Sequence, residues 1–139
     1  TRLLDMGVEP FLASSSLECV IAQRLVRLVC QNCKTPVQPK KEVLEQLGPL
    51  ELDISKMTLF EGKGCENCKF TGYKGRTGIY EILLITEPIR ELILKRTSSQ
   101  EIKKKAVSLG MRTLRQDGLE KVLKGSTTIS EILRVTQQE

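Results

Sequence analysis

Residues 30–33 read Cys-Gln-Asn-Cys, and residues 65–68 repeat this spacing as Cys-Glu-Asn-Cys. Two residues between paired cysteines let both sulfurs of one tight turn reach the same ion, and two such pairs supply the four thiolates of a tetrahedral site. The sequence therefore predicts a small module held by one structural zinc ion. Four thiolate ligands leave no open position for a catalytic water. The predicted metal ligands are Cys30, Cys33, Cys65 and Cys68.

Other interpretations of the cysteine pairs stay open at this point, namely a redox dithiol, disulfides or another soft metal. A redox dithiol benefits from an attacking cysteine at a helix N-terminus, whereas Cys30 is predicted at the C-terminal end of a helix. Disulfides suit secreted proteins, and we see no secretion signal in the sequence. Lys34 and Lys69 directly follow the pairs, and we expect their ammonium groups to offset part of the thiolate charge. Cys19 is expected to be a small buried apolar residue and not a ligand.

The composition fits one compact domain or two small modules. The 139 residues are 40% hydrophobic and 28% charged, and they include no histidine, which excludes Ser-His-Asp triads and HExxH zinc sites. The formal net charge is +5, and residues 71–139 carry the whole excess, with 13 basic against 8 acidic side chains. This excess fits either a nucleic-acid or anionic-membrane surface, or the solvated faces of helices. A zinc-ribbon module that binds nucleic acid is therefore the alternative function.

The N-terminal half is predicted to mix helices with short strands. Residues 1–6 read as the end of a helix closed by Gly7. Apolar residues at helical spacing predict a long amphipathic helix over 17–29, with serines 14–16 as N-cap candidates. Pro36 and Pro39 favour extended chain after the first cysteine pair. Further elements are predicted as a short helix over 41–47 and strands over 57–61 and 77–84.

The C-terminal third is predicted to be helical. Pro88 suits the first turn of a helix that ends at Lys95. Capping boxes at Ser98–Glu101 and Thr128–Glu131 predict two further helix starts. A helix over 111–124, interrupted by Gly118, is expected between them.

The chain carries no phosphate-binding loop of the Walker A type, and we recognise no Walker B motif, so we do not expect it to hydrolyse ATP alone. The glycine-rich stretch 72–78 precedes a predicted strand, which favours a turn. Its alternative role is a phosphate or partner contact through Lys74 and Arg76.

Taken together, these motifs resemble the ATPases of type II secretion and type IV pilus assembly, most closely the general secretory pathway protein E branch. The resemblance covers nearly the whole chain. The matching stretches are residues 1–12, Ala-Gln-Arg-Leu-Val-Arg at 22–27, the four cysteines, 64–73, Gly-Arg-Thr-Gly-Ile-Tyr-Glu at 75–81, and 111–119.

The resemblance implies the C-terminal part of a hexameric, cytoplasmic P-loop motor whose ATP- and Mg²⁺-binding residues lie upstream. It implies partners in an inner-membrane secretion platform, with no nucleic acid and no direct membrane insertion. The expected fold is α+β, with residues 1–29 from the end of a RecA-like core, 30–84 as the metal-binding module and 85–139 as a helical subdomain. Gln23 and Arg24 would then lie in a helix beside the motor core, either near nucleotide or a subunit interface, or as ordinary polar positions. The function expected of the chain is structural or docking, within a motor that powers protein export through pseudopilus assembly.

Overall fold

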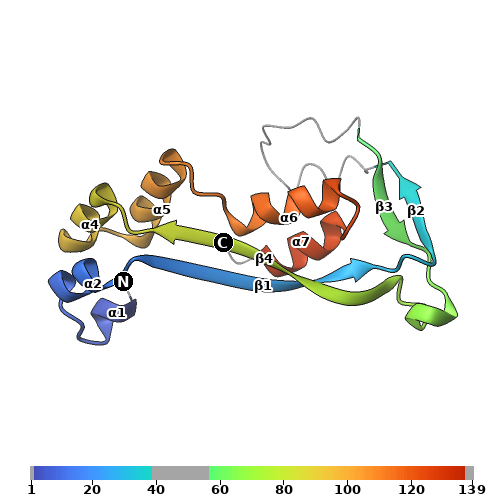
Figure 1. Ribbon diagram of the computed structural model, residues 1–139, viewed down its shortest axis with the longest axis horizontal. Coiled ribbons are helices and arrows are strands. Elements are labelled where there is room, and N and C mark those ends of the chain that lie inside the picture. The colour runs from blue at the N-terminus through green and yellow to red at the C-terminus, as the bar shows by residue number, and fades with distance from the viewer. Residues whose placement is uncertain (1, 39–56, 137–139) are drawn as a thin grey trace. The chain divides into compact units, whose positions relative to one another are not determined.

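The computed structural model describes residues 2–38 and 57–136 and contains both helices and strands (Figure 1). Strands β1 and β4 pair in one two-stranded sheet, and β2 and β3 pair in another. The α+β class is therefore confirmed, whereas the helix predicted over 41–47 and the extended chain at Pro39 lie outside the described residues. In chain order the elements are α1 (Arg2–Asp5), α2 (Pro10–Ser16), β1 (Cys19–Val29), β2 (Lys34–Val37), β3 (Leu59–Gly62), η2 (Glu66–Cys68), β4 (Tyr73–Leu84), α4 (Glu87–Leu94), α5 (Ser99–Ser108), α6 (Leu114–Leu123) and α7 (Ile129–Thr136).

Strand β1 corrects the sequence analysis, because its residues were predicted to form the helix over 17–29. The serines end helix α2 and do not begin a new helix, since the Ser15 hydroxyl donates back to the Phe11 carbonyl at 2.8 Å. Beyond them, β-branched residues are frequent in β1, and pairing with β4 supplies backbone partners that helical spacing alone does not reveal. Three predictions that depended on this helix change with it. Cys19 is exposed and not buried, and the helical setting expected for Gln23 and Arg24 is an exposed stretch of strand. Cys30 follows this strand and does not end a helix.

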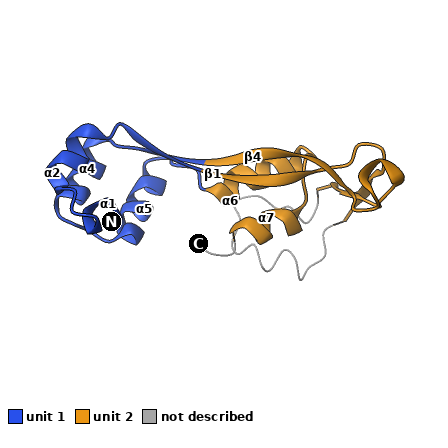
Figure 2. Cartoon of the chain, turned by 90° about the horizontal axis from the view of Figure 1, so that it is seen from below, with its two compact units in different colours: residues 1–22, 81–113 blue, residues 23–80, 114–139 orange. Residues whose placement is uncertain are grey.

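The described chain divides into two compact units, each built from two segments (Figure 2). Unit 1 comprises residues 1–22 and 81–113, and unit 2 comprises residues 23–80 and 114–139. Strands β1 and β4 run in opposite directions, and each contributes residues to both units (Figure 1).

Unit 1 is mainly helical, with a small core around Ile85, Ile89 and Ala106. Helix α1 ends as predicted, with Gly7 at a φ of +89°. Helix α4 has its proline in the first turn, and α5 begins at the expected cap, where the Ser98 hydroxyl accepts from the Glu101 amide at 3.3 Å. The helix starts predicted for this unit are therefore confirmed.

Unit 2 has the larger core, to which the strands and helices α6 and α7 both contribute. Its buried members are Val26, Leu59, Ile79, Leu114, Leu119, Val122, Ile129, Ile132 and Leu133. Gly118 lets α6 approach α7 closely, because a Cβ at that position would lie 2.7 Å from the Ile132 Cδ1. Helix α6 begins at Leu114, three residues later than predicted, and α7 begins after Thr128 as predicted. Strands and helices of this unit thus share one hydrophobic core.

Candidate metal centre

The four predicted ligands come together in unit 2. Their Sγ atoms all lie within 4.8 Å of one another, with 3.9 Å between Cys30 and Cys65, 3.9 Å between Cys33 and Cys68, and 3.7 Å between Cys65 and Cys68. Four sulfurs bound tetrahedrally at about 2.3 Å from one zinc ion are about 3.8 Å apart. The cysteines are free thiols, and a disulfide would bring two sulfurs to about 2.05 Å. The cluster therefore fits a single tetrahedral ion better than either disulfide or redox pairs.

Antiparallel pairing of β2 and β3 brings the cysteine segments toward each other. The register places Lys34, directly after the first pair, opposite Gly62, just before the second. The Lys63 amide also donates to the Cys33 carbonyl at 3.1 Å. The first cysteine pair therefore joins β1 to β2, and the second lies in the connection from β3 to β4.

The second pair is shaped by a short 3-10 helix, η2, followed by left-handed backbone. Lys69 and Phe70 have φ angles of +52° and +60°, which non-glycine residues adopt infrequently. The Phe70 amide donates to the Cys65 carbonyl at 2.9 Å, and a Cβ on Gly64 would lie 2.7 Å from the Phe70 carbonyl oxygen. The turn therefore closes tightly enough to direct both sulfurs of the pair inward.

The backbone of Gly72 hydrogen-bonds with both cysteine segments. Its carbonyl accepts from the Cys30 amide at 2.9 Å, and its own amide donates to the Cys68 sulfur at 3.3 Å. It also passes against Gly62, where a Cβ would lie 2.0 Å from the Gly72 oxygen. From the sequence, Gly64 and Gly72 are expected to supply the backbone freedom that brings amides near the ligand sulfurs, and this expectation is confirmed for Gly72. A glycine four residues after a ligand was the available signal.

The thiols differ in their readiness to ionise. Burial raises the pKa of Cys33 to about 12, and hydrogen bonds with neighbouring thiols add to the rise. Burial also opposes ionisation of Cys68, but the amides of Cys65 and Gly72, with the Cys65 and Cys33 thiols, lower its pKa to about 6. At neutral pH the first negative charge therefore forms on Cys68. A bound cation would favour ionisation of the others.

Two lysine roles considered in the sequence analysis can be compared with the structure. The Lys34 ammonium lies 4.4 Å from the centroid of the Phe60 ring, so a cation–π contact engages it. Lys74 lies in β4 and donates to the Asn67 side chain within the second cysteine pair. Arg76 lies in the same strand. The stretch 72–78 is thus largely strand, and Lys74 contacts the turn that holds the second cysteine pair.

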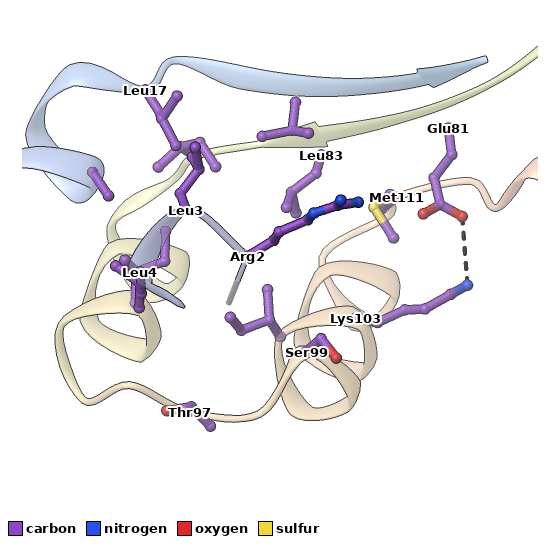
Figure 3. Close-up of a pocket in the computed structure, with 15 residues that line it drawn as sticks. Arg2, Leu3, Leu4, Leu17, Glu81, Leu83, Thr97, Ser99, Lys103 and Met111 are labelled. Carbon is purple, nitrogen blue, oxygen red and sulfur yellow. Dashed lines mark ion pairs between the residues drawn. The ribbon is translucent and has the colours of Figure 1, made fainter. Parts of the chain in front are cut away.

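A second feature is an apolar cavity in unit 1, with a volume of about 420 Å³ (Figure 3). Polar groups in its lining include Arg2 and the ion pair between Glu81 and Lys103, whose charged atoms are 3.7 Å apart. Its apolar walls include Leu3, Leu4, Leu17, Leu83 and Met111. The lining has no cysteine and no cluster of metal ligands, which leaves the cysteine cluster of unit 2 as the stronger candidate site.

Comparison with known proteins assigns a family to this arrangement. The model of the family described as "Type II/IV secretion system protein" matches residues 1–134. The Type IV pilus assembly ATPase PilB of Thermus thermophilus is 50% identical over 98% of this chain and 15% of its own length. The Type II secretion system protein E of Pseudomonas aeruginosa is 46% identical over 100% of this chain and 27% of its own length. The Type II secretion system ATPase E of Vibrio cholerae is 42% identical over 99% of this chain and 27% of its own length.

The chain thus spans only 15% to 27% of the length of these relatives. Among residues 2–38 and 57–136, no helix combines the length and hydropathy of a membrane-spanning segment.

Proposed function

Because the chain belongs to the Type II/IV secretion system protein family, we propose that it is the zinc-stabilised region of a motor that powers protein export by type II secretion. The parent protein is a cytoplasmic hexamer that uses ATP and Mg²⁺ and drives pseudopilus assembly. This region contributes structure and a docking surface and performs no catalysis itself. The relatives named as type II secretion proteins support this branch, and the pilus assembly ATPases among the relatives support the same motor class.

One observation carries the structural part of this proposal. Four cysteine sulfurs from two separate segments share a cluster whose spacing suits one tetrahedral ion. Thiolates are soft ligands and a complete set of four suits structural zinc. Zinc would be bound by Cys30, Cys33, Cys65 and Cys68, and its charge would compensate the thiolates. Bound metal would join the β1–β2 connection to the β3–β4 connection.

The remaining assignments follow from the family. We propose that residues 1–29 derive from a RecA-like core, residues 30–84 form the metal-binding module and residues 85–139 form a helical subdomain. The fixed surface around the metal docks onto platform proteins of the inner membrane or onto a neighbouring subunit. The motor is accordingly peripheral to that membrane through its partners.

Metal analysis of matched cysteine variants tests the zinc assignment. We expect the purified chain to hold one zinc ion per chain, measured by mass spectrometry of the metal, and Cys30→Ser to lose it. Cys19→Ser is the matched control, because Cys19 is an exposed cysteine outside the cluster. Its zinc content should equal that of the unmodified chain. A chain without stoichiometric metal, or a Cys30→Ser variant that keeps it, would overturn the proposal.

A further inference from the structure

Glu131 is a buried carboxylate outside the cysteine cluster. It lies in α7 with 1% of its surface exposed, and both of its oxygens are paired. The Arg27 Nε contacts one carboxylate oxygen, and the Arg134 guanidinium contacts the other. A buried charge is costly to leave without partners, so this carboxylate holds both arginines in place.

Arg27 connects the carboxylate to the first cysteine segment. It lies three residues before Cys30 on β1, and its guanidinium lies 4.1 Å from the centroid of the Tyr73 ring. The backbone of the same stretch is fixed by the turn before α7, because the Thr127 hydroxyl donates to the Arg27 carbonyl at 2.8 Å. Strand β1 is therefore held by both side-chain and backbone contacts immediately before it delivers the first ligand.

Tyr73 connects the same helix to the second cysteine segment. Its hydroxyl lies 2.9 Å from the Thr128 hydroxyl, which accepts from the Glu131 amide at 3.2 Å. Tyr73 directly follows Gly72, whose amide donates to the Cys68 sulfur. Two chains of contact, one from each cysteine segment, therefore meet at the first turn of α7, which packs in the core shared with the strands (Figure 1).

We propose that Glu131 is a positioning residue for the metal centre, acting through Arg27 and not as a ligand. The carboxylate fixes the strand that ends directly before Cys30, so that the sulfur is held in position in the cluster and the bound ion is released slowly. This inference rests on the proposed binding of zinc by the four cysteines. It concerns a residue 63 positions after the last of those cysteines, Cys68.

The two arginines provide an internal control. Both contact Glu131, but only Arg27 lies on the strand that leads to a ligand, whereas Arg134 lies in α7 itself. Loss of either arginine weakens the ion pair. A role in positioning therefore predicts that zinc release responds to Arg27 and not to Arg134, whereas a merely structural role predicts that release in each variant follows its loss of unfolding free energy.

The experiment measures the rate at which zinc passes from the full chain to an excess of coloured chelator. Supporting residues around a metal site change affinity by about 10- to 100-fold when they are mutated. Glu131→Gln keeps the side-chain shape without the charge, and we expect it and Arg27→Gln to release zinc about tenfold faster. Arg134→Gln should release zinc at nearly the unmodified rate. Glu91→Gln, which alters an exposed pair with Lys95 in unit 1, is the second control.

Cobalt substitution supplies an independent measurement. The absorption spectrum of bound Co²⁺ reports ligand geometry, and we expect it to change in Arg27→Gln and to keep its form in Arg134→Gln. Equal release rates and equal spectra for the two arginine variants would overturn the positioning role while leaving zinc binding intact. An unmodified chain that binds neither Zn²⁺ nor Co²⁺ would overturn the proposed function itself, and this inference with it.

Discussion

The two compact units differ in the interactions that stabilise each of them. Among its described residues, unit 1 has a cluster of three buried residues beside a cavity of about 420 Å³, and its helices α4 and α5 begin at a proline and at a serine cap. Among the described residues, unit 2 has nine buried residues in its main hydrophobic cluster, and it adds a cysteine cluster and a buried ion pair that join segments distant in sequence. Local signals therefore set the helix starts of unit 1, while contacts such as the Ile85 amide donating to the Glu18 carbonyl at 2.9 Å join its two segments. Unit 2 depends on contacts that bridge 35 residues between Cys30 and Cys65 and 104 residues between Arg27 and Glu131.

Metal removal should produce the largest difference in hydrogen-exchange protection between the two units. Structural zinc contributes an apparent binding free energy of about 10–16 kcal/mol in small peptides at pH 7, comparable with the stability of a whole domain. We expect chelation under reducing conditions to increase hydrogen exchange of the backbone amides of unit 2, while its hydrophobic core keeps the metal-free unit folded in the absence of denaturant. The α4 and α5 amides of unit 1 should keep their protection.

Peptide-resolved hydrogen exchange before and after chelation measures this difference. Helices α6 and α7 should respond together with the strands of unit 2, because they pack with strand residues in one core. Unchanged exchange in a verified metal-free sample would contradict the proposed stabilisation by zinc.

Two matched core substitutions test whether the units are energetically distinct. Ile79 and Ile89 are both fully buried, the first in unit 2 and the second in unit 1. Replacing either with alanine should cost about 2–5 kcal/mol in the free energy of unfolding of its own unit. Ile79→Ala should also accelerate zinc release, and Ile89→Ala should leave it unchanged.

Denaturant unfolding followed together with zinc release checks this pair. Because the residue type and burial are the same, the comparison isolates the unit in which the cavity is made. Equal acceleration of zinc release by the two variants would show that the chain unfolds as a single cooperative body.

The smallest expected effect is a pH dependence of the metal-free, reduced chain. The pKa of Cys68 is about 6 in the folded state and near 9 for an ordinary thiol, so the unfolded chain binds more protons between these values. Stability from this group is therefore present above about pH 9 and is lost as the pH falls through about 6. Cys33 has the opposite sign, because its pKa of about 12 reduces stability only as the pH rises above about 9.

Urea midpoints at pH 6, 7 and 8 measure this dependence. We expect the midpoint to rise with pH in the unmodified metal-free chain and in Cys33→Ser. Cys68→Ser should remove most of the rise. A midpoint that falls over this range, or an equal rise in Cys68→Ser, would contradict the assignment of the first thiolate to Cys68.

Local chemistry explains which parts of the fold could be predicted from sequence. The proline in the first turn of α4 and the Ser98 cap of α5 act within one turn, so their positions are visible in the sequence. Local sequence did not predict strand β1, because a run such as Val20, Ile21, Val26 and Val29 fits helical spacing as well as a strand. Only pairing with β4, more than 40 residues later, decides between them.

The candidate site likewise combines residues that the sequence predicts with residues whose role depends on distant contacts. Paired cysteines have a spacing whose chemistry is specific, so the four ligands were predicted before their geometry was known. The supporting groups carry weaker signals. Gly72 can be recognised as a glycine that lets an amide approach a ligand sulfur. Glu131 reads as half of a capping box, whereas its carboxylate pairs with Arg27 across the unit.

The division of the chain has a practical consequence for protein engineering. Residues 81–113 form an insertion within unit 2, which resumes at residue 114. The Tyr80 amide donates to the Asp117 carboxylate at 3.0 Å, so the chain leaves unit 2 beside the helix where it returns. A short linker could therefore replace the insertion, and with residues 1–22 also removed this would yield a single-core miniprotein of 84 residues, 23–80 and 114–139.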